Sequence, residues 1–307
     1  MTRPGAVRVR AYAKVNLTLR VGPVQADGFH PLQTVFQSLA LHDTLEITPR
    51  PGPFELTCSD AGVPVDGRNL VTRAAQALWS ALGRDGEPRG VRVHLDKHIP
   101  LQAGLGGGSS DAASALSALA CAWQPRRARV DLAAIAGRLG SDVPYFLVGG
   151  TALGLSRGEE LYPLEDLPAC FVVLALPAFG VATADAYRWL DEDRRSRAAA
   201  LREPGRTLPA WRGLPLTLAN DLEAPVTSRH PEIGAARRAL EAAGARAAAM
   251  TGSGSAVFGL FGAEPAARRA ARSVAEAGFV AMLTRTVDRR TCQRIHFSFA
   301  SSSPRHA

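Results

Sequence analysis

A glycine- and serine-rich stretch is the first part of this chain whose residue types could do chemistry. Residues 104–110 hold four glycines and two serines around Leu105, between a strand-like segment and an alanine-rich one. Converging backbone N–H groups at the start of a helix form an anion site, and glycine lets a phosphate approach because it has no Cβ. We therefore expect a phosphate site. No lysine follows the last glycine, so the stretch is not a Walker loop.

The same stretch is also compatible with a plain capped helix. Ser109 and Ser110 suit N-cap positions, and Asp111 in the first turn would complement the helix dipole. In the phosphate-binding interpretation, either serine hydroxyl could instead reach a metal ion carried by the phosphates. The stretch taken alone does not separate the two interpretations. A second glycine segment, residues 250–258, is by itself typical of a hairpin.

Lysine is scarce in a chain with 36 basic residues, and its two occurrences are Lys14 and Lys97. Where arginine fills almost every cationic position, a remaining lysine is a candidate for a site that needs a compact ammonium. Chance retention is the alternative for either residue. The net charge of +8 does not predict a nucleic-acid interface, because the basic residues are spread along the chain.

Length and composition limit the class of protein. A chain of 307 residues suffices for one large or two ordinary domains. It contains no run of about 18 apolar residues, and its first residues lack the apolar core of a signal peptide, so we expect a cytoplasmic protein without a membrane span. Four widely spaced cysteines predict reduced thiols, with neither a disulfide framework nor a zinc knuckle.

The elements that must position these residues follow from hydrophobic periodicity, which predicts an α+β protein of two closely meeting domains. We expect a polar insertion up to about residue 213 and a disordered tail over residues 301–307. Strands are expected at 7–21, 32–47, 90–100, 144–158, 170–177, 247–261 (a pair) and 279–287, and helices at 69–83, directly after the glycines, at 130–139, near 183–192, within 218–244 and at 265–277.

Three segments in order resemble the three motifs of the GHMP kinase family, which includes homoserine and mevalonate kinases. They are AKVNLTLRV at 13–21, PLQAGLGGGSSDAA at 100–113 and MTGSGSAVF at 250–258. Each motif is weak alone, whereas the ordered set is specific and covers nearly the whole chain. DGFHPLQTVFQSL at 27–39, GSDVPYFL at 140–147 and NDLE at 220–223 are similar to a subgroup whose acceptor alcohol carries a cytidine diphosphate.

The resemblance implies a two-domain α+β fold and an ATP-dependent small-molecule kinase. Residues 1–159 would form an N-terminal, ribosomal-protein-S5-like α/β domain with the ATP phosphate loop, and residues 160–307 a C-terminal ferredoxin-like domain. ATP would be the phosphoryl donor, and Mg²⁺ would arrive with it, since no separate protein metal site is implied. The implied partner is the cytidine-diphosphate substrate, with neither nucleic acid nor membrane, and the protein would be a monomer or homodimer.

The resemblance also implies site residues. Asp142 would be the catalytic base and Lys14 the ammonium beside it. His30 would hydrogen-bond the cytosine next to Phe29, and Tyr187 would stack on that ring; Phe29 stands in place of a more common tyrosine and Tyr187 in place of a phenylalanine. Asn16 and Thr183 would also contact substrate, Lys97 and Asn69 would border the adenine, and the phosphate loop would comprise Pro100, Leu101, Gln102, Ala103, Gly104, Leu105, Gly106, Gly107, Gly108, Ser109 and Ser110.

Each of these residues taken alone also has a plain structural interpretation. Asp142 could form a turn before Pro144, Lys14 could be a surface charge, and Tyr187 could be a core residue. Two alternatives to the cytidine-dependent kinase stay open. One is a homoserine- or mevalonate-type kinase, and the other is a catalytically silent nucleotide-binding regulator, which the presence of both Asp142 and Lys14 disfavours.

Overall fold

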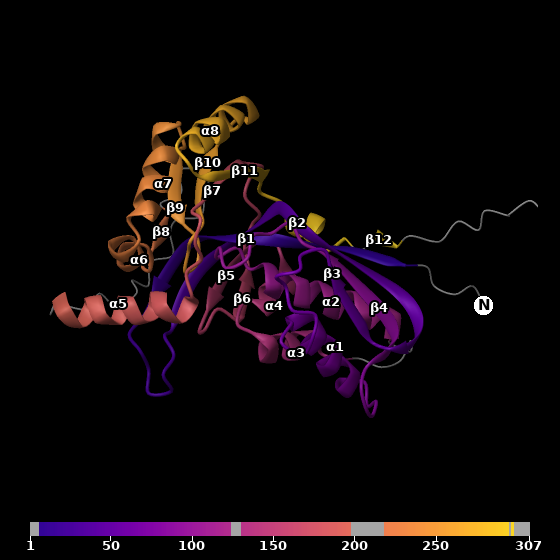
Figure 1. Ribbon diagram of the computed structural model, residues 1–307. Coiled ribbons are helices and arrows are strands. Elements are labelled where there is room, and N and C mark those ends of the chain that lie inside the picture. The colour runs from indigo at the N-terminus through magenta and orange to yellow at the C-terminus, as the bar shows by residue number, and fades with distance from the viewer. Residues whose placement is uncertain (1–5, 124–129, 198–217, 295, 298–307) are drawn as a thin grey trace, which may run out of the picture.

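The computed structural model describes residues 6–123, 130–197, 218–294 and 296–297. Most of the expected insertion, and the expected disordered tail, lie outside these residues. Two β-sheets organise the described chain, one in each half of the molecule (Figure 1). Within the described residues no helix has the length and apolar character needed to cross a membrane.

The first sheet is built on a long antiparallel hairpin of β1 (Val7–Val21) and β2 (Leu32–Pro53). The hairpin confirms the two extended segments expected at 7–21 and 32–47. Its register shifts between Tyr12 and Lys14 and again between Asn16 and Thr18. Such irregularities re-aim side chains. The sheet is completed by β3 (Glu55–Cys58), β4 (Arg89–Asp96), β5 (Thr151–Leu155), β6 (Glu160–Pro163), β8 (Ala219–Asn220) and β12 (His296–Phe297).

Four helices cover one face of the first sheet. Alternate apolar residues of the strands, such as Leu45 and Val93, pack against helix residues such as Leu78 and Leu116, and all four are fully buried. Helix α2 is central, because it contacts β1, β2 and the three other helices. The helices are α1 (Leu70–Ala81), α2 (Gly107–Trp123), α3 (Leu132–Leu139) and α4 (Val143–Val148).

The second sheet has the strand order β11-β7-β10-β9, and every neighbouring pair in it is antiparallel. Its βαββαβ chain order with this strand arrangement is the ferredoxin-like pattern that was expected. Helices α7 and α8 pack on the sheet. The strands are β7 (Phe171–Leu176), β9 (Ala247–Met250), β10 (Val257–Phe261) and β11 (Val280–Arg285); the helices are α5 (Thr183–Arg197), α6 (Glu223–Arg229), α7 (Pro231–Ala242), α8 (Glu264–Glu276) and the short α9 (Arg289–Cys292).

The two sheets share a common core, which explains why the domains meet closely. Val15 and Leu17 of β1 are buried in one apolar cluster with Leu174 of β7 and Phe258 of β10. The expected boundary between residues 159 and 160 falls in the turn between the paired strands β5 and β6. We therefore propose a boundary between Pro163 and Phe171, after which the chain enters the second sheet.

The strand expected over residues 144–158 is wrong in its first half. Residues Val143–Val148 form helix α4, and only Thr151–Leu155 form a strand. A short apolar run such as PYFLV does not distinguish a strand from a buried helix. Pro144 suits the first helical turn, where the missing N–H costs no hydrogen bond.

Candidate active site

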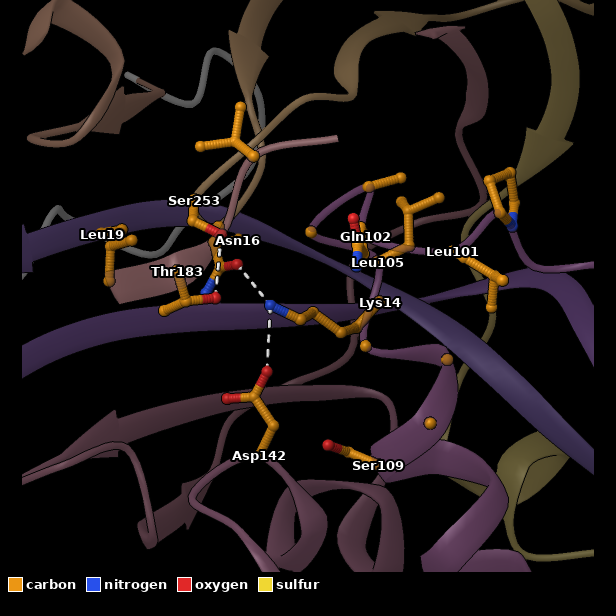
Figure 2. A pocket seen from close by; sticks show the side chains of 18 of the residues that line it. Lys14, Asn16, Leu19, Leu101, Gln102, Leu105, Ser109, Asp142, Thr183 and Ser253 are labelled. Carbon is orange, nitrogen blue, oxygen red and sulfur yellow. Dashed lines mark hydrogen bonds and ion pairs between the residues drawn. The ribbon is translucent and has the colours of Figure 1, made fainter. Parts of the chain in front are cut away.

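A cavity of about 600 Å³ lies where the two domains meet and brings together most of the residues singled out in the sequence. Its walls come from β1, β2, the glycine loop, the residue before α4, the start of α5 and the second glycine segment (Figure 2). The expected site residues that line it are Lys14, Asn16, Lys97, Pro100, Leu101, Gln102, Ala103, Gly104, Leu105, Gly106, Gly107, Gly108, Ser109, Asp142, Thr183 and Tyr187. Phe29, His30, Asn69 and Ser110 are not part of its lining.

Lys14 and Asp142 form an ion pair at the wall of this cavity. The Lys14 Nζ lies 3.2 Å from Asp142 Oδ2 and donates to Asn16 Oδ1 at 2.7 Å. The Asn16 amide is itself oriented, because its Nδ2 donates to Thr34 Oγ1 at 2.7 Å. Lys14 and Asn16 are two residues apart on β1 and project to the same face. The ammonium is therefore held between an amide oxygen and a carboxylate (Figure 2).

The two partners of this pair differ in exposure. The Lys14 side chain is buried, whereas Asp142 is about one-third exposed at 35%. Asp142 precedes α4, but its side chain makes no capping hydrogen bond to the helix. The carboxylate is thus not used by a local turn, and it is accessible from the cavity. This arrangement can accept a proton from a bound hydroxyl group.

Helix α2 begins at Gly107, earlier than expected. The N–H of Ser110 already donates to the carbonyl of Gly106 at 2.9 Å, so the serines lie in the first turn and are not N-caps. The N–H groups of a first turn have no partner within their helix, and here they belong to Gly107, Gly108 and Ser109. All three residues line the cavity. Together with the helix dipole they form a site suited to a phosphate.

Packing within the protein requires glycine at two positions of the loop. Gly104 has φ +73°, and a Cβ there would overlap the carbonyl oxygen of Thr251 in the second glycine segment. Gly106 has φ +72°, and a Cβ there would lie 2.7 Å from Phe146 Cζ. Gly108 is different, because its nearest neighbour would be 3.9 Å away. The two glycine segments of the sequence are therefore packed against each other.

The two serines of the loop have different roles. Ser110 is buried, and its hydroxyl donates to the carbonyl of Tyr12 at 2.7 Å. Ser109 lines the cavity. Of the two hydroxyls considered for a phosphate-bound metal ion, only that of Ser109 faces the site. Across the described ranges no cluster of three or more His, Cys, Asp or Glu side chains could hold a metal ion.

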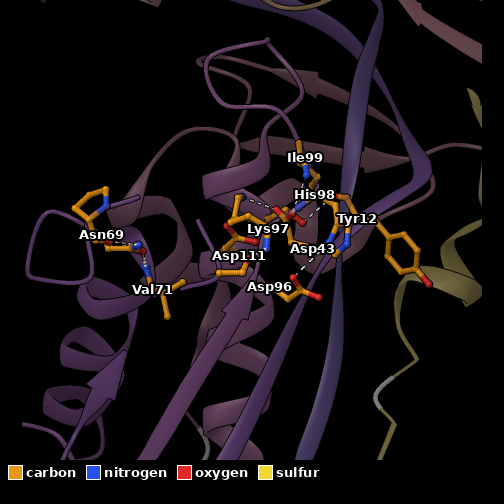
Figure 3. Close-up of polar contacts among 12 residues, drawn as sticks. Tyr12, Asp43, Asn69, Val71, Asp96, Lys97, His98, Ile99 and Asp111 are labelled. Atoms are coloured by element: carbon orange, nitrogen blue, oxygen red, sulfur yellow. Dashed lines mark hydrogen bonds and ion pairs between the residues drawn. The ribbon is translucent and has the colours of Figure 1, made fainter. Parts of the chain in front are cut away.

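Behind the glycine loop, Lys97 is paired with two buried carboxylates (Figure 3). Its Nζ donates to Asp43 Oδ2 at 2.5 Å and to Asp111 Oδ2 at 2.8 Å. The other oxygen of Asp43 accepts the backbone N–H groups of His98 and Ile99. This Asp43–Lys97–Asp111 cluster ties β2 to both ends of the loop. Sequence reasoning missed Asp43, although an acid inside an apolar strand was a usable signal.

The cluster also shifts the protonation of its members. Burial raises the pKa of Asp111 to about 8, although the neighbouring Lys97 opposes the shift. Burial alone would lower the pKa of Lys97, but Asp111 and Asp43 outweigh it and raise the pKa overall. Asp111 Oδ1 is buried and has no hydrogen-bond partner within the described part of the chain. Burial therefore favours the protonated form of Asp111, against the opposing effect of the Lys97 ammonium.

Asn69 has a local structural role. Its Oδ1 accepts the N–H of Val71 at 2.8 Å and caps α1, while its Nδ2 donates to the carbonyl of Pro64 at 2.6 Å. Its side chain is thus engaged at the start of the helix, and Asn69 does not line the cavity.

The expected base-binding residues come from the loop between β1 and β2 and from helix α5. Thr183 and Tyr187 of α5 line it, and burial raises the pKa of Tyr187, so its phenol stays protonated. The His30 ring lies 5.3 Å from the Tyr187 ring. Phe29 is half exposed at 50%, with the Arg157 guanidinium 3.7 Å from the centre of its ring. The structure thus brings Tyr187 and His30 together and leaves Phe29 at the surface.

The fold and the cavity together define a GHMP kinase. The family models described as GHMP kinases N terminal domain and GHMP kinases C terminal match residues 69–150 and 199–279. A solved homoserine kinase from Cytophaga hutchinsonii, at 18% identity and a TM-score of 0.67, covers 96% of this chain and 99% of its own, and shows the shared fold.

Proteins of higher sequence identity indicate which subgroup of the GHMP kinases this chain belongs to. The 4-diphosphocytidyl-2-C-methyl-D-erythritol kinase of Anaeromyxobacter sp. (strain K) is 45% identical over 91% of this chain and 90% of its own. That of Moorella thermoacetica is 43% identical over 90% and 98%. A solved 4-(cytidine 5'-diphospho)-2C-methyl-D-erythritol kinase has a TM-score of 0.74 at 36% identity, covering 91% and 98%. The chain belongs to the 4-diphosphocytidyl-2-C-methyl-D-erythritol kinase family of GHMP kinases.

Proposed function

We propose that this protein transfers the γ-phosphoryl group of ATP to the 2-hydroxyl of 4-(cytidine 5'-diphospho)-2-C-methyl-D-erythritol, a step of non-mevalonate isoprenoid precursor biosynthesis. The observation that carries the proposal is the Lys14–Asp142 ion pair, which shares one cavity with the glycine loop. The names of relatives at 43–45% identity over about nine-tenths of the chain support the choice of acceptor. We also propose a cytoplasmic location, where the ATP that the reaction consumes is available.

In this proposal Asp142 is the catalytic base. A carboxylate is a weak base toward an alcohol, with an ordinary pKa near 3.9. Phosphoryl transfer passes through a loose transition state, so the hydroxyl proton leaves late and a weak base suffices. Asp142 then orients the hydroxyl and accepts its proton while the new O–P bond forms. General-base catalysis of this kind contributes about 10²- to 10⁴-fold, or roughly 3–5 kcal/mol.

Lys14 acts beside this base. Its buried ammonium, held by Asn16, lies next to the oxygen that attacks and to the phosphoryl group in transfer, where it offsets negative charge.

Ser253, whose hydroxyl lies 3.2 Å from that of Thr183, closes the cavity on the side of the second domain and belongs to the acceptor end. Positioning and charge compensation together are what phosphoryl transfer requires.

The donor would be held by the glycine loop. The N–H groups of Gly107, Gly108 and Ser109 would bind the phosphates of ATP. Mg²⁺ bound with ATP neutralises charge on its phosphates, and the donor set fits this role, since Ser109 can offer one oxygen while water and phosphates supply most ligands. The chain itself contributes the backbone cradle and this hydroxyl.

The test is a kinase assay with ATP and a panel of alcohols. We expect turnover with 4-(cytidine 5'-diphospho)-2-C-methyl-D-erythritol and at least about 100-fold lower kcat/KM with homoserine, with mevalonate and with the same erythritol phosphate lacking cytidine. Comparable turnover of homoserine or mevalonate would overturn the choice of acceptor. ATP binding without turnover of any of these alcohols would favour a silent nucleotide-binding regulator.

A further inference from the structure

The segment NDLE at 220–223 has no part in the proposed mechanism, yet it connects the two domains beside the cavity. It begins at the end of β8, which runs parallel to β1 with Leu19 opposite Asn220. The carboxylate of Asp221 accepts the backbone N–H of Val21 at 3.0 Å, and the N–H of Asp221 donates to the carbonyl of Leu19 at 2.9 Å. The segment is therefore fixed to β1 of the first domain.

Asn220 extends this connection to the second glycine segment, residues 250–258. Its Nδ2 donates to the carbonyl oxygens of Met250 and Gly252, each at 2.8 Å, and its Oδ1 accepts the N–H of Leu222 at 3.0 Å. Both hydrogens of the amide and its oxygen are thus engaged, and these bonds fix the orientation of the amide. Figure 1 shows β8 beside β9, the strand that ends at Met250.

Gly252 is the point where the second glycine segment meets the proposed reaction centre. It lines the cavity with φ +55°, and a Cβ on it would lie 3.5 Å from Lys14 Nζ. The same Cβ would lie 3.2 Å from the carbonyl oxygen of Gly104 in the glycine loop. The preceding residue, Thr251, accepts the backbone N–H of Asn16 at its Oγ1, at 3.1 Å. One short stretch of backbone therefore adjoins both the ammonium and the loop that would hold ATP.

The two carbonyl groups that Asn220 binds require a double donor. The oxygens of Met250 and Gly252 converge on one nitrogen, so without that nitrogen they would repel each other and lose their shared partner. The segment would relax by turning one carbonyl away, and the backbone of Gly252 would move relative to Lys14. A displacement of about 1 Å at a reacting group can cost about 10²-fold in rate.

We propose that Asn220 is a positioning residue for phosphoryl transfer, and that its amide sets the distance between Gly252 and the Lys14 ammonium. The inference rests on the proposed function, which gives Lys14 its role in the transfer. Asn220 does not line the cavity, so it acts through the backbone of Gly252. Its loss should therefore lower kcat and leave KM for the alcohol nearly unchanged.

The experiment replaces Asn220 by aspartate, which has the same shape but cannot donate to both carbonyl groups. Assayed well below its melting temperature, Asn220→Asp should lose about 10-fold or more in kcat, with KM for the alcohol within about three-fold of wild type. Asn220→Ala should show the same split between kcat and KM. It also keeps the test decisive if the aspartate variant does not fold, because water can reach the two carbonyl oxygens in the alanine variant.

Glu223→Gln is the matched control in the same segment. The Glu223 carboxylate accepts the N–H of Met250 at 2.9 Å and pairs with Arg237 at 2.9 Å. A glutamine oxygen can still accept that N–H, so the variant loses an ion pair without releasing Gly252. We expect its kcat to match that of wild type even if its melting temperature falls.

A measurement without turnover separates this inference from the proposed function. Calorimetry with a non-hydrolysable ATP analogue reports how firmly the glycine loop is held, because Gly252 packs against Gly104. The affinity should fall about five-fold or more in both Asn220 variants and stay unchanged in Glu223→Gln.

Absence of turnover by the wild-type protein would refute the proposed function, and the calorimetric affinities would then decide the inference. With an active wild type, a kcat within about two-fold of wild type in either Asn220 variant that unfolds cooperatively would overturn it. With an inactive wild type, an unchanged affinity for the ATP analogue in such a variant would overturn it.

Discussion

The Lys14 ammonium lies 3.2 Å from the Asp142 carboxylate, although one residue is on β1 and the other precedes α4. Lys14 is buried and bonded to Asn16, so its position is fixed by the first domain. Asp142 is partly exposed and reaches the cavity. The pair therefore presents a positioned carboxylate to any hydroxyl that binds opposite the glycine loop.

Replacing Asp142 by asparagine keeps the shape of the side chain and removes the base. We expect kcat to fall by about 10²- to 10⁴-fold, with KM for both substrates changed only a few-fold. Steady-state kinetics measures both constants, and Asp66→Asn on the surface is the control. A kcat within a few-fold of wild type would exclude Asp142 as the base.

Lys14→Met and Lys14→Arg separate charge from geometry. Both should lower kcat by about 100-fold or more, because a planar guanidinium does not reproduce a compact ammonium. The Lys14 side chain is also buried, which leaves little space for the larger guanidinium group. Recovery of at least about a tenth of wild-type kcat in Lys14→Arg would show that charge alone suffices.

Two glycine-to-alanine changes distinguish loop packing from phosphate binding. Gly108→Ala adds a methyl group whose nearest neighbouring atom would be 3.9 Å away, so the melting temperature should be unchanged or slightly higher. KM for ATP should rise about 10-fold or more, because the methyl group enters the phosphate site. Steady-state kinetics and thermal melting measure the two effects. An unchanged KM would place the phosphates elsewhere.

Gly104→Ala should act through stability. Its φ of +73° and the overlap with the Thr251 carbonyl strain the loop, and we expect the melting temperature to fall by several degrees. Scanning calorimetry of this variant beside Gly108→Ala gives the comparison. Equal melting temperatures for the two variants would contradict the close approach of the two glycine segments.

The raised pKa of Asp111, about 8, makes stability depend on pH in a defined direction. Between about pH 4 and pH 8 the folded state keeps a proton that the unfolded state releases. The free energy of unfolding therefore decreases with rising pH, by up to about 1.4 kcal/mol per pH unit from this group. Asp111→Asn should remove that decrease and be more stable than wild type near pH 8. Urea titrations of both proteins from pH 5 to pH 8.5 measure the difference, and parallel curves would show that Asp111 is ionised throughout.

Much of the fold could be predicted because periodicity reports burial directly. Apolar and polar residues alternate over residues 7–10 at the start of β1, where Val7 and Val9 are buried between exposed arginines, and the apolar stripe after the glycines marks α2. The error at residues 143–148 has the same origin. PYFLV is apolar throughout, and it forms a helix that packs against α2 and α3.

The interaction partners of polar residues could not be predicted from hydrophobic periodicity. Nothing near Lys97 in the chain indicates that Asp43 and Asp111 surround it, and nothing near His30 indicates Asp191. Ser109 and Ser110 are neighbours of one type, yet one faces the cavity and the other bonds to Tyr12. The side chains of adjacent residues on a helix point in different directions, and the surrounding fold decides which of them faces the cavity.

The amino-acid sequence by itself determined the family through three ordered motifs, the glycine loop suited to an anion, and the two lysines worth attention. The tertiary structure alone decided which lysine faces an available carboxylate, which serine is accessible and which acid contacts the histidine. The physical reason is that backbone preference and hydrophobic pattern are local, whereas an ion pair or a hydrogen bond depends on packing between segments distant in the chain.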